Sequence, residues 1–284
     1  MSDSRTALVL GGGGITGIAW EIGVLTGLAD AGVDLSTADL VVGTSAGSVV
    51  GAQITCGAEL PFLYERQLEP PSREKVARMT RAGLARYGWA LLRSRGSEED
   101  FRRRVGALAL AAERAGLTPS EEERLEVIGS RLVSLEWPSR PLVITAVDAD
   151  TGEFSAFDRD SGVPLLRAVA ASCAVPGVYP PVTIGECRYV DGGMRSAANT
   201  DLAQGYDRVV VLAPIPRGVG PMASVDRHVA GLTDARVAVV SPDAASRTAI
   251  GRNVLDPAAR APSVRAGREQ GRAVADRVAG AWNR

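Results

Sequence analysis

The sequence predicts an α/β protein in which a mainly parallel central sheet carries helices on both faces and is interrupted by a helical insertion. Short aliphatic runs, typical of buried parallel strands, recur along the chain at residues 6–10, 40–43, 142–147, 208–213 and 236–241. Helical patterns separate these runs. The chain has 284 residues, which is long enough to build such a sheet and to cover both of its faces.

The first aliphatic run leads directly into a glycine-rich loop. Gly11, Gly12, Gly13 and Gly14 are followed by Gly17, and a helical pattern of apolar residues then begins with Ile18, Ile22, Leu25 and Leu28. Residues without side chains allow several backbone N–H groups to converge on one anion. We therefore expect an anion-binding loop between the first strand and the first helix.

The same loop fits the G-x-G-x-x-G pattern of dinucleotide-binding proteins at Gly12, Gly14 and Gly17. That pattern needs an acidic residue at the end of the second strand to hold a ribose hydroxyl. Here Asp34 and Asp39 precede the second strand instead. A mononucleotide P-loop is disfavoured as well, because no Lys-Ser or Lys-Thr pair follows the glycines. The favoured use is an oxyanion hole, and a tight turn that only lets the helix pack closely is the alternative.

The second run ends in Gly43-Thr44-Ser45-Ala46-Gly47, ahead of another helical pattern. A serine in this setting is typical of a nucleophile elbow, a sharp turn between a strand and a helix in which the serine is strained. Gly43 and Gly47 would let neighbouring backbone approach closely. Ser45 would also lie at a helix N-terminus, which favours developing negative charge. We expect Ser45 to be a nucleophile, with an incidental serine in a glycine-rich turn as the alternative.

Two residues are candidates to accept the proton of Ser45. Asp191 ends a short β-like run, and Gly192 and Gly193 behind it would let it approach another loop. An aspartate within hydrogen-bond reach of a serine can serve as its general base. His228 is the only histidine and would complete a serine, acid, histidine order, although it lies in a polar stretch. The pattern favours Asp191 as the base and a solvated surface position for His228. A triad of Ser45, Asp191 and His228 remains the alternative.

Taken together, these motifs resemble the patatin-like phospholipase family. The resemblance rests on the first strand with its glycine loop, the Gly-Thr-Ser-Ala-Gly elbow, the motif Asp191-Gly192-Gly193, and the segment Ala-Ser-Cys-Ala-Val-Pro-Gly-Val-Tyr-Pro-Pro at 171–181. Residues 5 to about 60 and 140–214 carry the resemblance, which leaves the middle and the C-terminal part of the chain outside it.

Membership of this family would imply a three-layer α/β/α patatin-like fold and a Ser-Asp dyad that needs no histidine, metal or organic cofactor. It would imply that Ser45 attacks an ester carbonyl, that Asp191 accepts the proton, and that N–H groups of Gly12–Gly14 hold the oxyanion. One position departs from the family pattern, because Thr16 stands where the glycine loop usually carries Arg or Lys. Arg195 is a candidate replacement for that positive charge.

We expect one patatin-like domain over residues 1–284, with a helical insertion at about 61–137 and a helical C-terminal extension at about 243–284. The insertion is charged, and two helix starts are evident within it, one at Glu98 and one at Thr118-Pro119-Ser120-Glu121. A further strand, partly exposed, is expected at 153–157.

The most apolar stretch of the insertion contains Trp89, Leu91 and Leu92. These residues would enter the acyl region of a lipid surface if the insertion were a lid. A helical cap that packs permanently on the core is favoured instead, because amphipathic helices usually bury their apolar face. Peripheral membrane contact through the insertion is therefore the alternative to a fixed cap.

Composition limits the other classes of function. The net charge of −1 gives no electrostatic reason to expect nucleic acid as a partner. The three cysteines, Cys56, Cys173 and Cys187, lack metal-ligand spacing, and no clustered acidic loop suggests calcium. No apolar run is long enough to span a membrane, and the N-terminus does not resemble a signal peptide. We expect a cytoplasmic protein.

The sequence thus predicts a serine esterase or lipid acyl hydrolase that acts on an acyl ester or phospholipid through an acyl-enzyme intermediate. Two alternatives remain open. Thr16 in the glycine loop is compatible with a lipid-binding or regulatory protein of weak activity, and the same dyad is compatible with acyl transfer to an alcohol.

Overall fold

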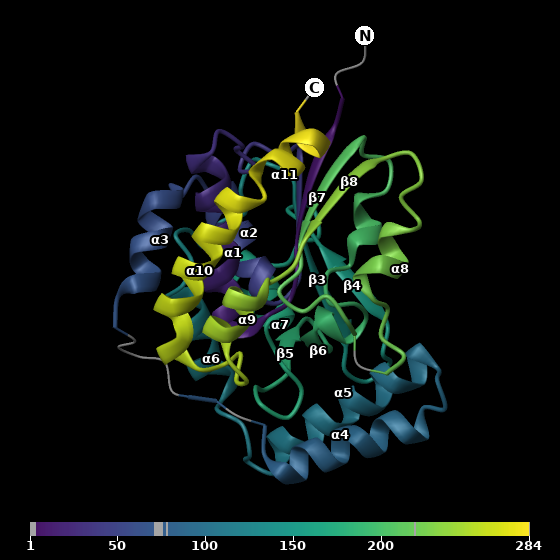
Figure 1. The fold of residues 1–284 in the computed structure, drawn as a ribbon. Coiled ribbons are helices and arrows are strands. Elements are labelled where there is room, and N and C mark those ends of the chain that lie inside the picture. Colours follow the sequence, from purple (N-terminus) through teal and green to yellow (C-terminus); the bar gives the residue numbers. More distant parts are fainter. Residues whose placement is uncertain (1–3, 71–75, 78, 219, 284) are drawn as a thin grey trace.

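The computed structural model describes residues 4–70, 76–77, 79–218 and 220–283, and these residues build one eight-stranded sheet flanked by helices (Figure 1). The strand order is β5-β6-β3-β2-β1-β7-β8, and β4 pairs with β3. The strands are β1 (Thr6–Leu10), β2 (Leu40–Gly43), β3 (Leu142–Asp148), β4 (Phe154–Phe157), β5 (Val182–Ile184), β6 (Cys187–Asp191), β7 (Arg208–Leu212) and β8 (Arg236–Val240).

The sheet is mainly parallel, as predicted. Strands β3, β2, β1, β7 and β8 run parallel, and all five predicted core strands lie among them. The expected partly exposed strand is β4, which pairs antiparallel with β3. Strands β5 and β6 form an antiparallel hairpin whose second strand pairs with β3, so that Asp191 lies opposite Ala146. This hairpin brings the acid to the sheet.

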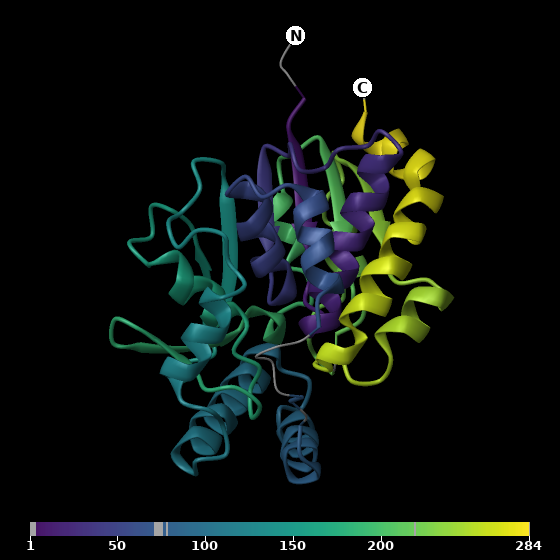
Figure 2. The same ribbon diagram turned by 90° about the vertical axis from the view of Figure 1, so that its left-hand side faces the viewer.

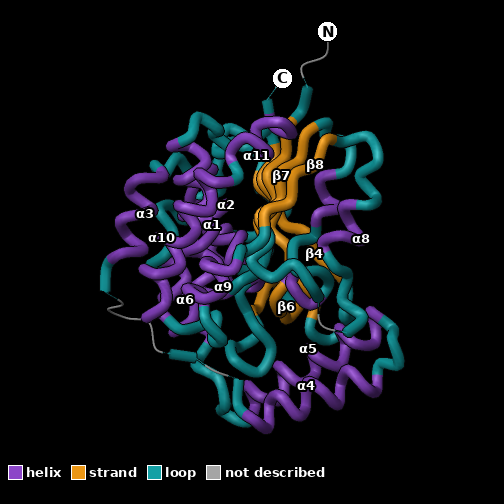
Figure 3. Tube along the Cα trace, in the orientation of Figure 1, coloured by secondary structure: helices purple, strands orange, loops and turns teal. Residues whose placement is uncertain are grey.

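Most helices cover one face of the sheet (Figure 3). They are α1 (Gly14–Asp30), α2 (Ala46–Thr55), α3 (Leu60–Leu68), α7 (Leu165–Ser172), α9 (Ala244–Ile250), α10 (Arg260–Ala273) and α11 (Ala275–Trp282). The other face is covered by α8 (Val225–Val229) and the short helix η2 (Thr200–Ala203). Alternate residues of β1 serve the two cores, since Leu8 and Leu10 face the first layer while Ala7 and Val9 face the second.

Helix α10, in the C-terminal part of the chain, lies directly against α1 (Figure 2). Glycines make the close approach possible, because a Cβ on Gly23 would lie 2.9 Å from the backbone nitrogen of Arg268, and one on Gly271 would lie 3.0 Å from the Cα of Gly27. Helices that meet backbone to backbone in this way need small residues at the contact. The C-terminal part of the chain is therefore part of the main helical layer.

The predicted insertion, at about 61–137, contains α4 (Arg81–Arg93), α5 (Glu98–Arg114) and α6 (Glu121–Gly129), and it also takes in most of α3, which packs in the main helical layer. Both helix starts expected from the sequence are confirmed. The hydroxyl of Ser97 caps α5, and Ser120 with Glu123 forms a capping box at the start of α6. Helices α4 and α5 project at the end of the molecule opposite α11 (Figures 1 and 2). The division of the chain into one domain with an insertion and an extension stays a prediction.

Within the described part of the chain, no helix combines the length and the apolar character that crossing a bilayer requires.

Candidate active site

Ser45 occupies the turn between β2 and α2 and has a strained backbone. Its φ is 53° and its ψ is −114°, in a region that L-residues other than glycine rarely adopt. Strain of this kind costs about 1–3 kcal/mol and persists only where the surrounding structure imposes it. The predicted nucleophile elbow is therefore present as a backbone conformation.

The elbow glycines are required by close packing of backbone. A Cβ on Gly43 would lie 2.6 Å from the Cα of Ser48, and the Cα of Gly47 abuts the carbonyl oxygen of Leu10. The N–H of Gly47 donates to the carbonyl of Gly11 at 3.0 Å. Helix α2 is thereby tied to the glycine loop, and Ser45 is placed beside that loop.

The peptide groups of Ser45 are held by side chains at the C-terminal end of α7 and in α2. The N–H of Ser45 donates to the hydroxyl of Ser172 at 2.9 Å, and the carbonyl of Ser45 accepts from Ser48 Oγ at 2.7 Å and Cys173 Sγ at 3.2 Å. These contacts offset part of the backbone strain. The segment 171–181 thus supports the elbow.

Asp191 ends β6 and lies beside Ser45. Its carboxylate lies near the Ser45 hydroxyl, which lowers the pKa of Asp191, and Oδ1 accepts a hydrogen bond from the N–H of Gly193 at 2.8 Å. Ser45 is 7% exposed and Asp191 only 3%. Burial raises the pKa of Asp191 to about 6, against the opposing effects of the nearby Ser45 hydroxyl, of the hydrogen bond from Gly193 and of the charge of Arg124. Asp191 is therefore mostly ionised at neutral pH and is able to take a proton.

Gly192 and Gly193 shape the loop that follows the acid. The Cα of Gly192 abuts Thr145, and a Cβ on Gly193 would lie 2.9 Å from Asp191 Oδ1. Both glycines are therefore required by close contacts.

The glycine loop passes close to Ser45, since a Cβ on Gly12 would lie 3.4 Å from Ser45 Cβ. The N–H of Gly12 is already engaged, because it donates to the carbonyl of Ala197 at 2.7 Å. Among the described residues, the N–H groups of Gly13 and Gly14 donate to no protein acceptor. They lie at the N-terminus of α1, where N–H groups point out of the helix. Within the described glycine loop, the N–H groups of Gly13 and Gly14 thus remain for an anion, whereas the N–H of Gly12, also expected to hold the oxyanion, is engaged by Ala197.

Thr16 and Gly17 anchor the start of α1. The Thr16 hydroxyl is buried within hydrogen-bond distance of the carbonyl of Val254 at 3.3 Å, and a Cβ on Gly17 would lie 3.2 Å from Ala46 Cβ. Thr16 therefore takes part in anchoring the loop. The idea that Arg195 supplies a charge there is not supported, because its guanidinium forms a bidentate pair with Asp201.

His228 lies apart from the serine and the acid. It belongs to α8, and its Nδ1 is 2.9 Å from Asp201 Oδ1. Its side chain is 13% exposed, so the expectation of a solvated surface histidine is wrong. Although partial burial opposes it, the nearby His228 imidazole and the pair with Arg195 hold the pKa of Asp201 well below its usual range. The structure does not assemble a triad of Ser45, Asp191 and His228.

Asn199 is a polar residue of the site that the sequence analysis missed. It is fully buried with a φ of 51°, and its Nδ2 lies 3.0 Å from Thr44 Oγ1 and 3.3 Å from the carbonyl of Gly192. Its Oδ1 accepts from Arg195 at 2.8 Å. The Asn199 side chain thus links Thr44, which precedes Ser45, to Gly192, which follows Asp191. The sequence signal was an asparagine, a residue that tolerates positive φ, shortly after a double glycine.

Arg124 and Tyr179 were also missed. A cavity of about 20 Å³ beside Ser45 is lined by both side chains. Arg124 comes from α6, is buried, and lies with its guanidinium carbon 3.6 Å from the centre of the Tyr179 ring. Its positive charge favours the ionised form of Asp191. No local pattern in a charged helix distinguishes this arginine from its exposed neighbours.

A larger cavity of about 540 Å³ adjoins the one at Ser45 and shares Arg124 and Tyr179 with it. Its apolar lining comes from Ile15, Val76, Ala77, Leu117, Pro119, Val127 and Val178. An apolar chain attached to a carbonyl at Ser45 would find room there. Over the described ranges, no group of three or more His, Cys, Asp or Glu residues is arranged to hold a metal ion.

Two solved structures are similar to this chain. The chain resembles the crystal structure of VipD from Legionella pneumophila with a TM-score of 0.50 and 13% identity, over 97% of this chain and 67% of VipD. It also aligns with the type III effector protein ExoU, with a TM-score of 0.43 and 17% identity, over 97% of this chain and 53% of ExoU. At these identities the likeness to VipD concerns the fold alone. None of the curated proteins compared with the chain matches it.

Fold and site together define an α/β protein with a nucleophile elbow whose serine lies near a buried aspartate. The sequence profile of the patatin-like phospholipase family matches residues 8–203, which is more than half of the chain. The chain therefore belongs to the patatin-like phospholipase family, and the resemblance noted in the sequence is confirmed. The fold prediction is confirmed as well, and membership supports lipid hydrolysis as the general class of activity.

Proposed function

We propose that this protein is a serine hydrolase that cleaves acyl esters of lipids with Ser45 as nucleophile and Asp191 as proton acceptor. The observation that carries the proposal is that the hydroxyl of the strained Ser45 lies near enough to the buried carboxylate of Asp191 to lower its pKa. A base must lie within hydrogen-bond reach of the proton it removes and must be ionised, and Asp191 meets both conditions at neutral pH.

In the first half-reaction Ser45 Oγ bonds to the ester carbonyl carbon while its proton passes to Asp191. The oxyanion accepts hydrogen bonds from Gly13 and Gly14, and the N-termini of α1 and α2 add favourable partial charge. Such donors are worth about 3 kcal/mol of barrier each. The alcohol leaves with the proton from Asp191. Water then attacks the acyl-Ser45 ester while Asp191 accepts its proton. Ser45 Oγ leaves with that proton from Asp191, and the carboxylic acid is released.

The acyl chain is assigned to the cavity of about 540 Å³ next to Ser45. Helix α4 is assigned to peripheral contact with a lipid surface. Its Leu84, Trp89 and Leu92 side chains are exposed, its sequence contains arginines and no acidic residue, and the guanidinium of Arg93 lies 4.4 Å from the Trp89 ring centre. A basic helix with an exposed apolar side suits an anionic bilayer surface.

The test is hydrolysis of p-nitrophenyl esters of graded chain length by the wild-type protein, Ser45→Ala, Asp191→Asn and His228→Ala. We expect a loss of at least about 100-fold in the first two variants, the range for removing a nucleophile or a general base. His228→Ala is the matched control, since His228 pairs with Asp201. Equal losses in all three would contradict the dyad. No wild-type turnover on any ester or on phospholipid vesicles would favour a lipid-binding protein, and product esters formed with added glycerol would favour acyl transfer.

A further inference from the structure

The turn before Ser45 and the loop after Asp191 meet at one fully buried amide, that of Asn199. Its Nδ2 lies 3.0 Å from Thr44 Oγ1 and 3.3 Å from the carbonyl oxygen of Gly192. A carbonyl oxygen can only accept a hydrogen bond, so this end of the amide must be the NH2 group. The link between the two segments therefore depends on which way the Asn199 amide faces.

Arg195 keeps the amide in this orientation. Its Nη1 donates to Asn199 Oδ1 at 2.8 Å, and a guanidinium has donors but no acceptor. If the amide turned over, its NH2 group would face the guanidinium and its oxygen would face the carbonyl of Gly192. Donor would then meet donor, and acceptor would meet acceptor. The charge-assisted bond from Arg195 therefore holds the amide in the one orientation that satisfies both of its ends.

Asp201 holds Arg195 in turn. Nη1 of the arginine lies 2.9 Å from Asp201 Oδ1, and Nη2 lies 2.6 Å from Oδ2. The guanidinium carbon also lies 4.3 Å from the centre of the Phe154 ring. A planar fork that is held by a carboxylate and by a ring has little freedom to turn, so Nη1 stays aimed at Asn199. One chain of contacts thus runs from a partly exposed carboxylate to the neighbours of the serine and the acid.

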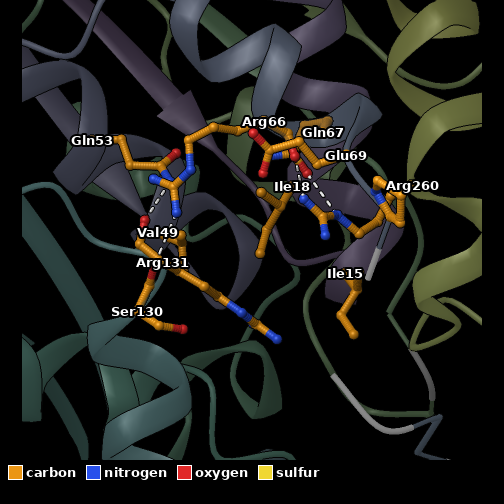
Figure 4. Close-up of a pocket in the computed structure, with 11 residues that line it drawn as sticks. Ile15, Ile18, Val49, Gln53, Arg66, Gln67, Glu69, Ser130, Arg131 and Arg260 are labelled. Atoms are coloured by element: carbon orange, nitrogen blue, oxygen red, sulfur yellow. Dashed lines mark hydrogen bonds between the residues drawn. The ribbon is translucent and has the colours of Figure 1, made fainter. Parts of the chain in front are cut away.

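Other arginines near the site make contacts of a different kind. Arg66 and Arg260 line a cavity of about 250 Å³ next to the one at the nucleophile (Figure 4). Arg66 Nη2 donates to the carbonyl of Ser130 at 2.9 Å, and Arg260 Nε donates to Gln67 Oε1 at 3.2 Å. These bonds join α3 to the turn after α6 and to α10. Arg195 differs from them because its contact with Asn199 leads to both reacting residues.

We propose that Arg195 and Asp201 are positioning residues for the proposed reaction. Their ion pair fixes the Asn199 amide, and the amide holds the turn of the nucleophile and the loop of the acid in reacting geometry. The inference rests on the proposed hydrolase function. Neither side chain is among the described lining of the cavity at Ser45, so both act through Asn199. Their loss should therefore lower kcat and leave KM close to the wild-type value.

The first test is a double-mutant cycle of Arg195→Met and Asn199→Gly, with kcat and KM measured on the preferred p-nitrophenyl ester. Arg195→Met alone is expected to lower kcat about tenfold, the size of one lost charge-assisted hydrogen bond. In the Asn199→Gly protein the same change is expected to lower kcat less than about twofold, because the residue through which Arg195 acts is already gone. Equal losses in both backgrounds, or no loss in either, would overturn the proposal.

Arg167→Met is the matched control for this cycle. Arg167 is also partly exposed and also bonds a carboxylate and a neutral oxygen, those of Glu121 and of the Thr183 carbonyl. Its loss is expected to leave kcat within about twofold of the wild type, since exposed ion pairs contribute little. A loss as large as that in Arg195→Met would show a general effect of broken ion pairs and overturn the proposal. Arg195→Lys, which keeps the charge but not the fork, is taken through the same cycle if Arg195→Met does not fold.

The second test separates this proposal from the proposed hydrolysis. Hydrogen exchange of the Asn199 side-chain NH2 group is followed by NMR, with its signals assigned by their loss in Asn199→Gly. Exchange is expected to be about tenfold faster in Arg195→Met and unchanged in Arg167→Met. Ester turnover together with exchange that is indifferent to Arg195→Met would overturn this proposal alone. Faster exchange in Arg195→Met, in a protein whose wild type hydrolyses no ester, would overturn the proposed function alone, and the orienting role of the ion pair would stand.

Discussion

The sheet and the helical segment from α3 to α6 contribute to the same site in different ways. The sheet side supplies Ser45, Asp191 and the glycine loop, and it holds them through contacts between backbone groups. The helical segment supplies Arg124 and Arg131, which reach the site only through their side chains. The sheet side therefore sets the reacting geometry, and the helical segment sets the charge around it.

The largest expected difference between the two regions comes from adding a methyl group to a glycine in each. Gly47→Ala would force a Cβ onto the Leu10 carbonyl and is expected to destabilise the protein by about 3 kcal/mol and to abolish activity. Gly88→Ala on α4 is the matched change, because no atom lies within 4 Å of its added Cβ. It is expected to stabilise α4 by up to about 1 kcal/mol. Denaturant unfolding of both variants measures the contrast, and a well-folded, active Gly47→Ala protein would contradict it.

Asn199 is the next place to test the sheet side. Asn199→Gly keeps the positive φ but removes the side chain that lies between Thr44 and the Gly192 carbonyl. We expect kcat to fall about 100-fold with little change in KM, because misplacement of reacting groups has effects of this size. Thr44→Val, which removes one of the two links, is expected to lose less. A proportional loss of kcat and thermal stability in both variants would point to a merely structural role.

The sequence predicted features that neighbouring residues encode and missed those that depend on contacts across the fold. The strands, the elbow, the acid and the two helix starts were recognisable because each is encoded by residues adjacent in the chain. Asn199 and Arg124 were not, because their roles depend on which side chains they meet across the fold. The packing of α10 on α1 was missed for the same reason, since a glycine such as Gly271 indicates a small residue but not the partner that requires it.

The helical segment is tested next by the pH dependence of kcat/KM, which reports on ionisations of the free enzyme. Asp191 must be ionised to accept a proton, so activity is expected to fall as pH decreases through about 6. The charge of Arg124 lowers the pKa of Asp191, so Arg124→Gln is expected to move this acidic limb to higher pH. Arg93→Gln, which removes an exposed arginine of α4, is expected to leave the limb in place. An unshifted limb in Arg124→Gln would show that Arg124 does not act on Asp191.

The raised pKa of Asp191 also affects stability. As pH rises, it lowers the free energy of unfolding, whereas activity is expected to increase. Folding raises the pKa of Asp191 from its ordinary 3.8 to about 6, so the folded protein holds this proton to higher pH than the unfolded chain. The contribution of Asp191 to the free energy of unfolding is therefore greatest below about pH 4 and is lost as pH rises through about 6. Asp191→Asn removes this dependence. Comparing the two proteins in denaturant at pH 5 and pH 7 measures it, and parallel changes in both would contradict the assignment.

The smallest expected effect concerns the outer side of α4. The inner side of α4 packs toward α5 through Tyr87, Ala90 and Leu91, as expected for a helical cap. On the outer side, Trp89 is 57% exposed and Leu92 is 78% exposed. If these exposed residues meet a lipid surface, Trp89→Ala should lower turnover of anionic phospholipid vesicles several-fold. Turnover of monomeric esters should stay near the wild-type value, because only the vesicle reaction gains from burying the indole ring. Leu135→Ala removes another exposed apolar side chain from outside α4 and controls for general loss of apolar surface. Equal effects of Trp89→Ala on vesicles and monomers would count against interfacial contact and would leave α4 as a helix that serves only to cover α5.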